Sequence, residues 1–535
     1  MADGGAAVRS PLAEHRVVVV GAGVGGLVAA LQLACRGLAV TLVEQAATPG
    51  GKMRRIDVGG AAIDSGPTVF TMRWVFEQIF DAAGATLGDR LRLTPLDVLA
   101  RHAWGRGGTL DLFAERERSI AAIEAFAGGD EAQRFARFCA QAKSLYRTLE
   151  LPYIRSSRPN LLQMAQSLGA RGLAELSRLG PGATLWSALA RQFRDPRLQQ
   201  LFARYATYCG SSPLAAPATL MLIAQVELDG VWTAEGGMHG VARALAQLAQ
   251  ERGVHVRYGA PVAAITVAHG RANGVELASG ERIAADSIVF NGDVNALASG
   301  RLGDAVRTAV AAVPAAERSL SAMTWSMHAR TQGFALHNHN VFFDDDYASE
   351  FNDIFCARRL PQQATVYLCA QDRTGARTVA DAPIDGRERL LALVNAPANG
   401  DQTTFSTAEI DACEQRMQRL LARCGLSVQI EPAHTVSTTP SAFEQLFPAT
   451  GGALYGRATH GWMALFRRES AASRLPGLYL AGGSVHPGPG VPMAAMSGQL
   501  AAATLLAHLD STSRSRRVVI SGGMSTPSAT TAGTA

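Results

Sequence analysis

Short runs of β-branched apolar residues alternate along the chain with longer stretches in which apolar residues recur at helical spacing. The short runs predict strands at Arg16 to Val20, Val40 to Val43, Val254 to Tyr258, Ala263 to Val267 and Ser287 to Phe290. The longer stretches predict helices over Glu131 to Leu149, Leu161 to Phe193 with a break at Gly180 and Pro181, Gly240 to Arg252, and Glu409 to Arg423. Because the strand runs cluster at the start and middle of the chain and helical runs fill the intervals, the pattern predicts an α/β fold with a helical insertion.

Both ends of the chain lack this periodicity. Residues 1–14 and 511–535 are rich in small and polar residues and are predicted to be disordered tails. Between them there is no repeat of fixed period and no low-complexity linker. The domains are therefore expected to be interleaved along the chain rather than joined end to end.

Composition narrows the class of protein. The 535 residues are several times a usual domain length, 47% of them are hydrophobic, and the net charge is only +5. A charge this small, spread thinly, predicts no nucleic-acid partner. The seven cysteines are odd in number and form no C-x-x-C pair, which indicates reduced thiols in a cytosolic compartment. The twelve histidines show no H-E-x-x-H spacing, so no metal site is expected.

The apolar run from Val17 to Cys35 carries the first chemical motif. Its 19 residues are enough to span a membrane, but four of them are glycines. A strand that runs into a turn and a helix explains the spacing: Gly21 permits the sharp turn, Gly23 lets backbone approach a pyrophosphate, and Gly26 lets the helix pack close to the sheet. Glu44 ends the next predicted strand, where a carboxylate can bind an adenosine ribose and would repel a 2′-phosphate. The motif predicts dinucleotide binding and disfavours NADP.

Further glycine turns favour FAD over NAD, because backbone can come close to an extended ligand at each of them. One turn follows Glu44, a second lies at Asp64 to Thr68, and a third follows the predicted strand before Gly482. A helix of small residues is predicted from Met493 to Leu509, with its N-terminus facing the flavin. The predicted cofactor-binding residues beyond the first motif are Gly50, Gly51, Lys52, Gly66, Pro67, Thr68, Val262, Asp293, Gly482, Gly483, Val491 and Pro492.

At these residues the chain resembles the bacterial and fungal carotenoid desaturase family of flavoproteins, over nearly all of residues 14–509. The resemblance is carried by the first glycine motif, Tyr208-Cys209-Gly210-Ser211-Ser212-Pro213, Gly230-Val231-Trp232, Gly236-Gly237-Met238, Asn291-Gly292-Asp293 and the run from Tyr479 to Gly488. The Ser211-Ser212 pair and the Gly482-Gly483-Ser484 turn depart from phytoene desaturases. Together with the run from Ala216 to Leu222, they resemble the branch of hydroxyneurosporene or 1-hydroxycarotenoid 3,4-desaturases.

The resemblance implies a flavin amine oxidase-like architecture, in which a Rossmann-like FAD-binding domain is interleaved with a mixed α+β substrate domain. The FAD-binding parts are expected at residues 15–95, 236–295 and 441–510, and the helical and substrate parts at residues 96–235 and 296–440. The division follows from placing each motif in the domain that the resemblance assigns to it.

The resemblance also implies an oxidoreductase that removes two hydrogens from adjacent carbons of an acyclic 1-hydroxy or 1-methoxy carotenoid, with a hydride passing to the flavin. Asp195 is hypothesised as the proton acceptor, although an Asp before Pro196 also fits a helix N-cap. His239 and His486 are expected to be structural. The alternatives are a phytoene or neurosporene desaturase, a carotene isomerase, a flavin amine oxidase and a non-enzymatic isoprenoid carrier.

An acyclic carotenoid is dissolved in the lipid bilayer. The resemblance therefore implies a bacterial cytoplasmic protein that associates peripherally with the membrane. The apolar segments Pro213 to Val226 and Leu161 to Phe193 are candidates for an interfacial patch and a substrate tunnel, and core packing explains them equally well. The electron acceptor is left open between oxygen and a quinone.

Overall fold

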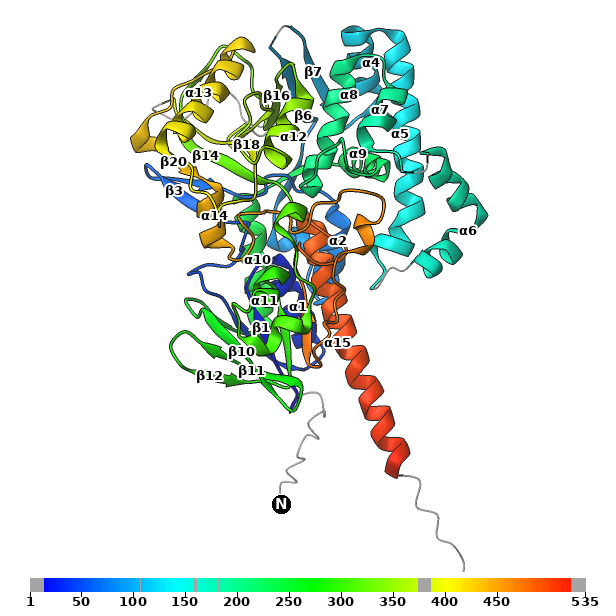
Figure 1. Cartoon of the computed structure of the whole chain (residues 1–535), viewed down its shortest axis with the longest axis vertical. Helices are drawn as coiled ribbons and strands as arrows, with labels where there is room; N and C mark the ends of the chain where they lie inside the picture. Colours follow the sequence, from blue (N-terminus) through cyan, green and yellow to red (C-terminus); the bar gives the residue numbers. More distant parts are fainter. Residues whose placement is uncertain (1–13, 106, 158–160, 181, 374–385, 521–535) are drawn as a thin grey trace, which may run out of the picture.

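The computed structural model describes residues 14–520 except 106, 158–160, 181 and 374–385. It has two lobes, and the long helix α15 runs from their junction along the lower lobe and beyond it (Figure 1). The five predicted strands and the predicted helices are all present, and the predicted α/β class is confirmed. Residues 1–13 and 521–535, which were predicted to be disordered, lie outside the described part.

A parallel sheet forms the centre of the lower lobe, and its strands come from three distant parts of the chain. It has the order β21-β13-β1-β2-β9, and β1 pairs in parallel with both β13 and β2. Next to it lies the antiparallel sheet β10-β11-β12. The strands are β1 (Arg16–Val20), β2 (Ala39–Val43), β9 (His255–Arg257), β10 (Val262–Ala268), β11 (Arg271–Leu277), β12 (Arg282–Ala284), β13 (Ser287–Phe290) and β21 (Leu478–Leu480). The middle of β1 is a continuous valine run because its residues are buried on both faces of the sheet.

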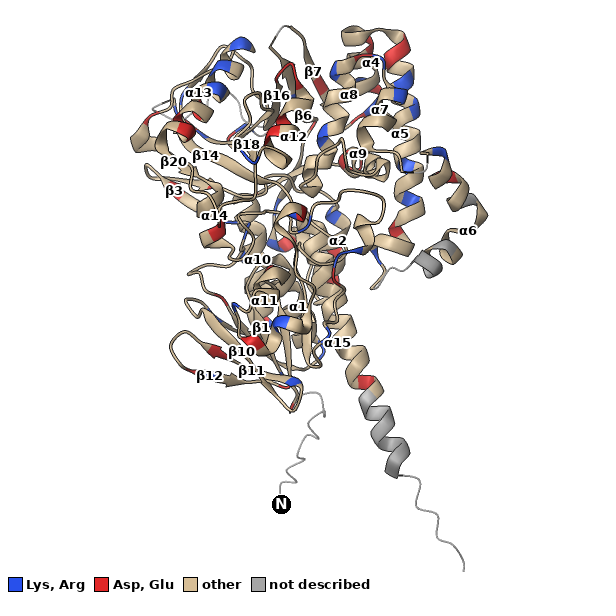
Figure 2. Ribbon diagram, viewed as in Figure 1, with Lys and Arg blue, Asp and Glu red and all other residues tan. Residues whose placement is uncertain are grey.

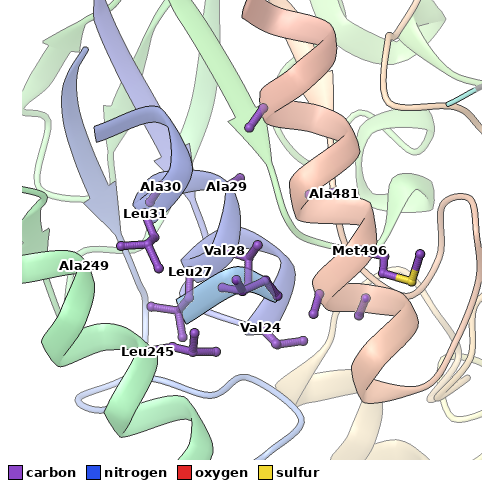
Figure 3. Packing of buried hydrophobic residues seen from close by; sticks show 14 of the residues in the cluster. Val24, Leu27, Val28, Ala29, Ala30, Leu31, Leu245, Ala249, Ala481 and Met496 are labelled. Carbon is purple, nitrogen blue, oxygen red and sulfur yellow. The ribbon is translucent and has the colours of Figure 1, made fainter. Parts of the chain in front are cut away.

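Three helices pack on this sheet, with α1 (Val24–Cys35) between α10 (Gly237–Glu251) and α15 (Val491–Ile520) (Figure 3). Leu27 and Leu31 of α1 meet Leu245 of α10, and Met496 of α15 lies on the other side. A Cβ atom at Gly498 would overlap the carbonyl oxygen of Gly25, so α1 and α15 touch backbone to backbone. This close packing holds the start of α1 in place.

The helix α15 is longer than predicted. The predicted end was Leu509, with a disordered tail from residue 511, but the helix continues to Ile520. Residues 511–520 contain neither Gly nor Pro, so nothing in the local sequence stops the helix there. The prediction that the tail begins at residue 511 was therefore wrong.

The upper lobe is built on a seven-stranded sheet of order β20-β14-β18-β17-β16-β6-β7. All neighbouring strands are antiparallel except β16 and β6. Its members are β6 (Val98–Trp104), β7 (Thr109–Phe113), β14 (Ser321–Ala329), β16 (His339–Phe343), β17 (Val366–Ala370), β18 (Glu388–Ala396) and β20 (Thr435–Thr438). The helix α13 (Thr407–Arg423) packs its buried residues against this sheet and begins with a capping box of Ser406 and Glu409.

A helical bundle lies beside this sheet (Figure 1). Its centre is a cluster of stacked, tilted and edge-on rings of Phe135, Phe138, Phe193 and Phe202, which come from two helices and from the residue that follows a third. The helices of the structure not yet given are α2 (Arg73–Ala82), α3 (Leu87–Arg90), α4 (Arg116–Ala127), α5 (Gly129–Leu149), α6 (Leu161–Arg178), α7 (Leu185–Gln192), α8 (Pro196–Ala203), α9 (Ile223–Leu228), α11 (Val294–Ala298), α12 (Tyr347–Phe355) and α14 (Pro440–Leu446). The short strands are β3 (Arg55–Val58), β4 (Ala61–Asp64), β5 (Leu93–Pro95), β8 (Trp232–Ala234), β15 (Thr331–Gln332) and β19 (Ser427–Val428).

Charged residues of both signs are scattered over both lobes (Figure 2). Among the described helices, none is long and apolar enough to cross a membrane. The apolar run from Val17 to Cys35 is divided between β1, the glycine turn and α1.

Candidate active site

One large cavity lies between the two lobes. Its volume is about 1180 Å³, which exceeds the roughly 300–1,000 Å³ of usual ligand pockets. Its wall begins at the glycine turn after β1, passes the ends of the lower sheet, and continues to the helical bundle and the large sheet. A cavity of this size and extent has room for more than one ligand.

The glycine turn at one end of the cavity leaves backbone donors exposed to it. Gly21 has φ +98°, a conformation that favours glycine, and its N–H donates to the carbonyl of Val43 at 2.8 Å. Gly23 precedes α1 without a side-chain cap, and the first turn of the helix carries no acidic residue. The N–H groups in the first turn of α1 are therefore suited to bind phosphate.

Asn291 explains why several positions in this turn must be glycine. Its amide donates to the carbonyl of Gly21 at 3.1 Å. A Cβ atom at Gly23 would lie 2.8 Å from Asn291 Nδ2, and one at Gly25 would lie 2.7 Å from Asn291 Oδ1. A Cβ atom at Gly26 would overlap the carbonyl oxygen of Gly21. Gly26 therefore packs inside the turn and does not line the cavity, which agrees with the packing role predicted for it.

Glu44 lies at the end of β2 and faces the same end of the cavity. Its carboxylate accepts the N–H of Ala22 at 2.6 Å and the N–H of Ala46 at 2.9 Å. The side chain is buried except where it lines the cavity. It is thus held rigidly in a position from which its remaining lone pairs can accept ribose hydroxyls.

We expect Glu44→Gln to weaken FAD binding about tenfold to a hundredfold, because hydrogen bonds to a charged group contribute roughly 1.5–3 kcal/mol. The amide would also place a donor against one of the two backbone N–H groups. Titration of the flavin-free protein with FAD, followed by flavin fluorescence, measures the change. Glu281→Gln is the matched control, since Glu281 pairs with Arg257 at the exposed surface. An unchanged dissociation constant for Glu44→Gln would remove Glu44 from the cofactor site.

The turn that follows Glu44 packs on the first glycine motif, and the turn at Asp64 to Thr68 packs on the turn that follows Glu44. The N–H of Gly50 donates to the carbonyl of Ala22 at 2.9 Å, and a Cβ atom at Gly66 would overlap the carbonyl oxygen of Lys52. The ammonium of Lys52 donates to the carbonyl of Leu454 at 2.6 Å. Burial lowers the pKa of Lys52.

The third predicted turn brings in a residue that the sequence analysis missed. The guanidinium of Arg468 donates to the carbonyls of Tyr455 at 3.1 Å, Gly483 at 3.3 Å and Arg457 at 2.7 Å. Asp293 caps α11 through the N–H of Asn295, and burial raises its pKa while the charges of Lys52 and Arg468 oppose that shift. Arg468 lies in a loop without glycine spacing, so no local motif marked it.

The predicted cofactor residues are brought together by the fold, with Gly26 as the first of two exceptions among all the predicted site residues. All of them except Gly26 line the cavity: Gly21, Gly23, Glu44, Gly50, Gly51, Lys52, Gly66, Pro67, Thr68, Val262, Asp293, Gly482, Gly483, Val491 and Pro492. The Cβ-free turns, the free first-turn donors of α1 and the buried Glu44 fit an extended dinucleotide such as FAD. The second exception is the predicted catalytic residue.

Asp195 does not line the cavity. It caps α8 through the N–H of Arg197, and its carboxylate also accepts side-chain hydrogen bonds from Nε and Nη2 of Arg197. Burial favours a higher pKa of Asp195, but the hydrogen bonds and charge of Arg197 outweigh it and lower that pKa. Asp195 is therefore a helix cap. Because it lies outside the cavity, its position does not support the proton-acceptor hypothesis.

The two histidines named from the sequence have structural surroundings. His239 lies in the first turn of α10, and its Nδ1 is 3.1 Å from the carbonyl oxygen of Met53. His486 is buried with its ring edge-on to Tyr153, and burial lowers its pKa to about 4.

The far end of the cavity is largely apolar. Its wall includes Leu149, Ile154, Leu220, Leu222, Ile223, Val226, Leu391, Leu393 and Leu465. The segment from Pro213 to Val226 therefore forms tunnel wall and core, and α7 from the other candidate segment is packed in the core of the bundle. Three polar residues in this wall, Arg204, Tyr208 and Glu227, were not predicted to be site residues.

Comparisons with known proteins agree with this geometry. The family model for flavin-containing amine oxidoreductases matches residues 24–506. The hydroxyneurosporene desaturase of Rubrivivax gelatinosus is 66% identical over 98% of this chain and 99% of that protein. The hydroxyneurosporene desaturase of Cereibacter sphaeroides is 46% identical over 93% of this chain and 99% of that protein. The 1-hydroxycarotenoid 3,4-desaturase of a Flavobacterium species is 30% identical over 91% of this chain and 98% of that protein.

Solved structures share the fold at low sequence identity. Putrescine oxidase bound to putrescine has a TM-score of 0.58 and 16% identity, covering 92% of this chain and 99% of that chain. Cyclohexylamine oxidase from Brevibacterium oxydans has a TM-score of 0.55 and 16% identity, covering 93% of this chain and 99% of that chain. At this identity the likeness shows the fold alone, and the predicted amine oxidase-like architecture is confirmed.

Proposed function

The chain belongs to the flavin-containing amine oxidoreductase family and, within it, to the carotenoid desaturases, and from that premise we propose that it introduces the 3,4 double bond into acyclic 1-hydroxy or 1-methoxy carotenoids such as hydroxyneurosporene. The observation that carries the proposal is the single cavity that joins the glycine turns to a long apolar chamber. The relative at 66% identity bears the name of this activity.

The residues at one end of the cavity are suited to bind the cofactor, and those at the other end are suited to bind the polyene. FAD, when bound, supplies a hydride acceptor for the carbon that loses hydrogen. The first-turn N–H groups of α1 and the carboxylate of Glu44 hold the dinucleotide, with Lys52 adding a positive charge near the second turn. The apolar wall excludes water from the polyene, so that cationic character developing on it is not captured by solvent.

The test is turnover by the FAD-loaded protein on carotenoids in liposomes. We expect hydroxyneurosporene to be converted to a product with longer-wavelength absorption, because its conjugated system grows, and neurosporene to be converted poorly. Efficient conversion of phytoene or neurosporene, isomerisation without net oxidation, or peroxide release from putrescine would each contradict the proposal in favour of a different activity. Oxygen uptake during turnover decides between oxygen and a quinone as the electron acceptor.

We also propose that the protein associates peripherally with the bacterial cytoplasmic membrane through an apolar surface that adjoins the wall of the cavity. Exposed apolar side chains gather on three segments there: Leu151 is 72% exposed, Leu173 47% and Trp462 60%. These segments adjoin one another, because the hydroxyl of Tyr153 donates to the carbonyl of Leu465 at 3.0 Å and α6 contacts the turn Glu150–Ile154. Tyr153 and Leu465 also line the cavity, so a carotenoid could pass from the bilayer into it.

The double substitution Leu151→Asp with Trp462→Asp is expected to lower the fraction of protein bound to liposomes about tenfold or more, since burying each such side chain contributes roughly 1.5–3 kcal/mol. Liposome flotation measures the bound fraction. Val436→Asp is the control, because Val436 is 41% exposed on β20, at the opposite side of the upper lobe from α6 (Figure 1). Equal liposome binding by the wild type and the double variant would contradict this docking surface.

A further inference from the structure

A small polar cluster interrupts the apolar wall of the chamber. It consists of Arg204 and Tyr208, in the helical turn Arg204–Cys209, and Glu227 in α9. Arg204 is 6% exposed and Glu227 is 7% exposed, and all three residues line the cavity. Burying two opposite charges in an otherwise apolar wall is costly unless they have partners.

The carboxylate of Glu227 is held from two sides. Tyr208 donates to its Oε1 at 2.6 Å, and Tyr205 donates to its Oε2 at 2.8 Å. Tyr208 lines the cavity, whereas Tyr205 is fully behind the wall. Glu227 is the one carboxylate that the helical bundle contributes to the described lining of the cavity.

Arg204 is less completely paired. Its guanidinium carbon lies 4.9 Å from the ring centre of Tyr208, and its Nε has no hydrogen-bond partner. Burial lowers the pKa of Arg204, but a hydrogen bond with Tyr208 and the nearby charge of Glu227 outweigh burial and raise it. The hydroxyls of Thr219 and Tyr347, which line the same chamber, also lack partners. The chamber therefore presents donors that a polar group on a ligand would satisfy.

A chain of hydrogen bonds also begins at the second cofactor turn, in the wall of the same cavity. The hydroxyls of Thr68 and Tyr367 are 2.6 Å apart, and the Tyr367 hydroxyl is 2.7 Å from His339 Nδ1. Burial and then the charge of Arg204 lower the pKa of His339 to about 3. Thr68 belongs to the second of the predicted cofactor turns and lines the cavity.

We propose that Arg204, Tyr208 and Glu227 bind the oxygen on C1 of the substrate and so position carbons 3 and 4 beside the cofactor. The inference rests on the proposed function, in which the new double bond begins two bonds from C1. A tertiary hydroxyl is one donor and two acceptors, so it can donate to Glu227 and accept from Arg204. A methoxy oxygen only accepts, and it would use Arg204 alone.

The two substrate types allow a sharp test with kcat and KM measured separately. Glu227→Gln is expected to raise KM for the 1-hydroxy carotenoid about tenfold or more, because a charge-assisted hydrogen bond is lost, and to change KM for the 1-methoxy compound less than about threefold. Arg204→Gln is expected to raise KM for both. Tyr205→Phe is the matched control: it removes a hydroxyl from the same carboxylate on the side away from the cavity, and the ratio of the two KM values should stay unchanged.

Two outcomes would overturn the assignment. If Glu227→Gln leaves the ratio of the KM values for the 1-hydroxy and 1-methoxy carotenoids unchanged, the cluster does not bind the C1 oxygen. If it lowers kcat equally for both substrates with KM unchanged, Glu227 acts in proton transfer instead. Should Glu227→Gln fail to fold, Tyr208→Phe removes a single oxygen and is expected to shift the ratio in the same direction by about threefold or more.

A binding measurement separates this proposal from the proposed function. Quenching of tryptophan fluorescence, with FAD-loaded protein, reports the dissociation constants of 1-hydroxyneurosporene and of neurosporene without turnover. We expect the wild type to prefer the hydroxylated compound and Glu227→Gln to lose that preference. A wild type that binds with this preference but forms no product refutes the desaturase function and keeps the binding site, whereas a wild type that forms product without the preference refutes the binding site alone.

Discussion

Replacing Gly26 by alanine is expected to yield a protein that binds no FAD and unfolds at lower temperature. The added Cβ would overlap the carbonyl oxygen of Gly21 and lie 3.0 Å from Asn291 Nδ2. Because the first of these is backbone inside the turn, the clash can be relieved only by moving α1 away from β1. Overpacking of this kind costs about 1–3 kcal/mol, occasionally more, and the moved turn no longer presents its donors to the phosphates.

The ratio of flavin to protein absorbance after purification, with a thermal melt, measures both effects. Gly88→Ala is the control, because a Cβ atom at Gly88 in α3 would meet nothing within 4 Å. If Gly26→Ala retains a full complement of flavin and melts like the wild type, the turn does not depend on close packing at this position.

Arg468→Met is expected to lower the free energy of unfolding by about 2–5 kcal/mol and to weaken FAD binding, since each polar group left unpaired inside the protein costs about 1–3 kcal/mol. The guanidinium connects the carbonyls of Tyr455, Gly483 and Arg457, and so ties the third cofactor turn to the loop before it. Methionine keeps most of the volume and removes all of these donors.

Urea unfolding of flavin-free protein measures the stability change apart from the change in cofactor affinity. Arg467→Met is the matched control in the adjacent position: its side chain is 54% exposed and lies 3.8 Å from Glu317, so the loss should be within about 0.5 kcal/mol. Equal stability of the two variants would show that Arg468 does not hold the third turn.

Local sequence determined the elements of the cofactor end. The valine run of β1, the glycines of the turn and Glu44 after β2 each act within a few residues of one another, so their spacing predicts both the structure and the ligand. The positive φ at Gly21 and the absence of a Cβ at Gly26, where it would overlap the carbonyl oxygen of Gly21, are requirements of the backbone itself. Such requirements restrict these positions to glycine wherever the turn occurs, so the sequence alone predicts the turn.

Capping showed the limit of this local reasoning. The sequence of Asp195 before Pro196 fits an N-cap and also permits a catalytic acid, and only the position of α8 behind the cavity wall separated the two. The helix α15 ended later than predicted for a similar reason, since residues 511–520 are compatible with either a helix or a tail.

What the sequence alone determined is the α/β class and the positions of the glycine turns, because these follow from short-range spacing and backbone geometry. The tertiary structure alone decided that Asn291, Arg468, Arg204 and Glu227 face one cavity. Arg204 and Glu227 are 23 positions apart with no other charged residue between them, and nothing in the sequence of that segment shows that their side chains meet. The sequence could not predict this because burial depends on tertiary packing. The packing of the bundle against the large sheet determines which polar side chains are buried and line the chamber.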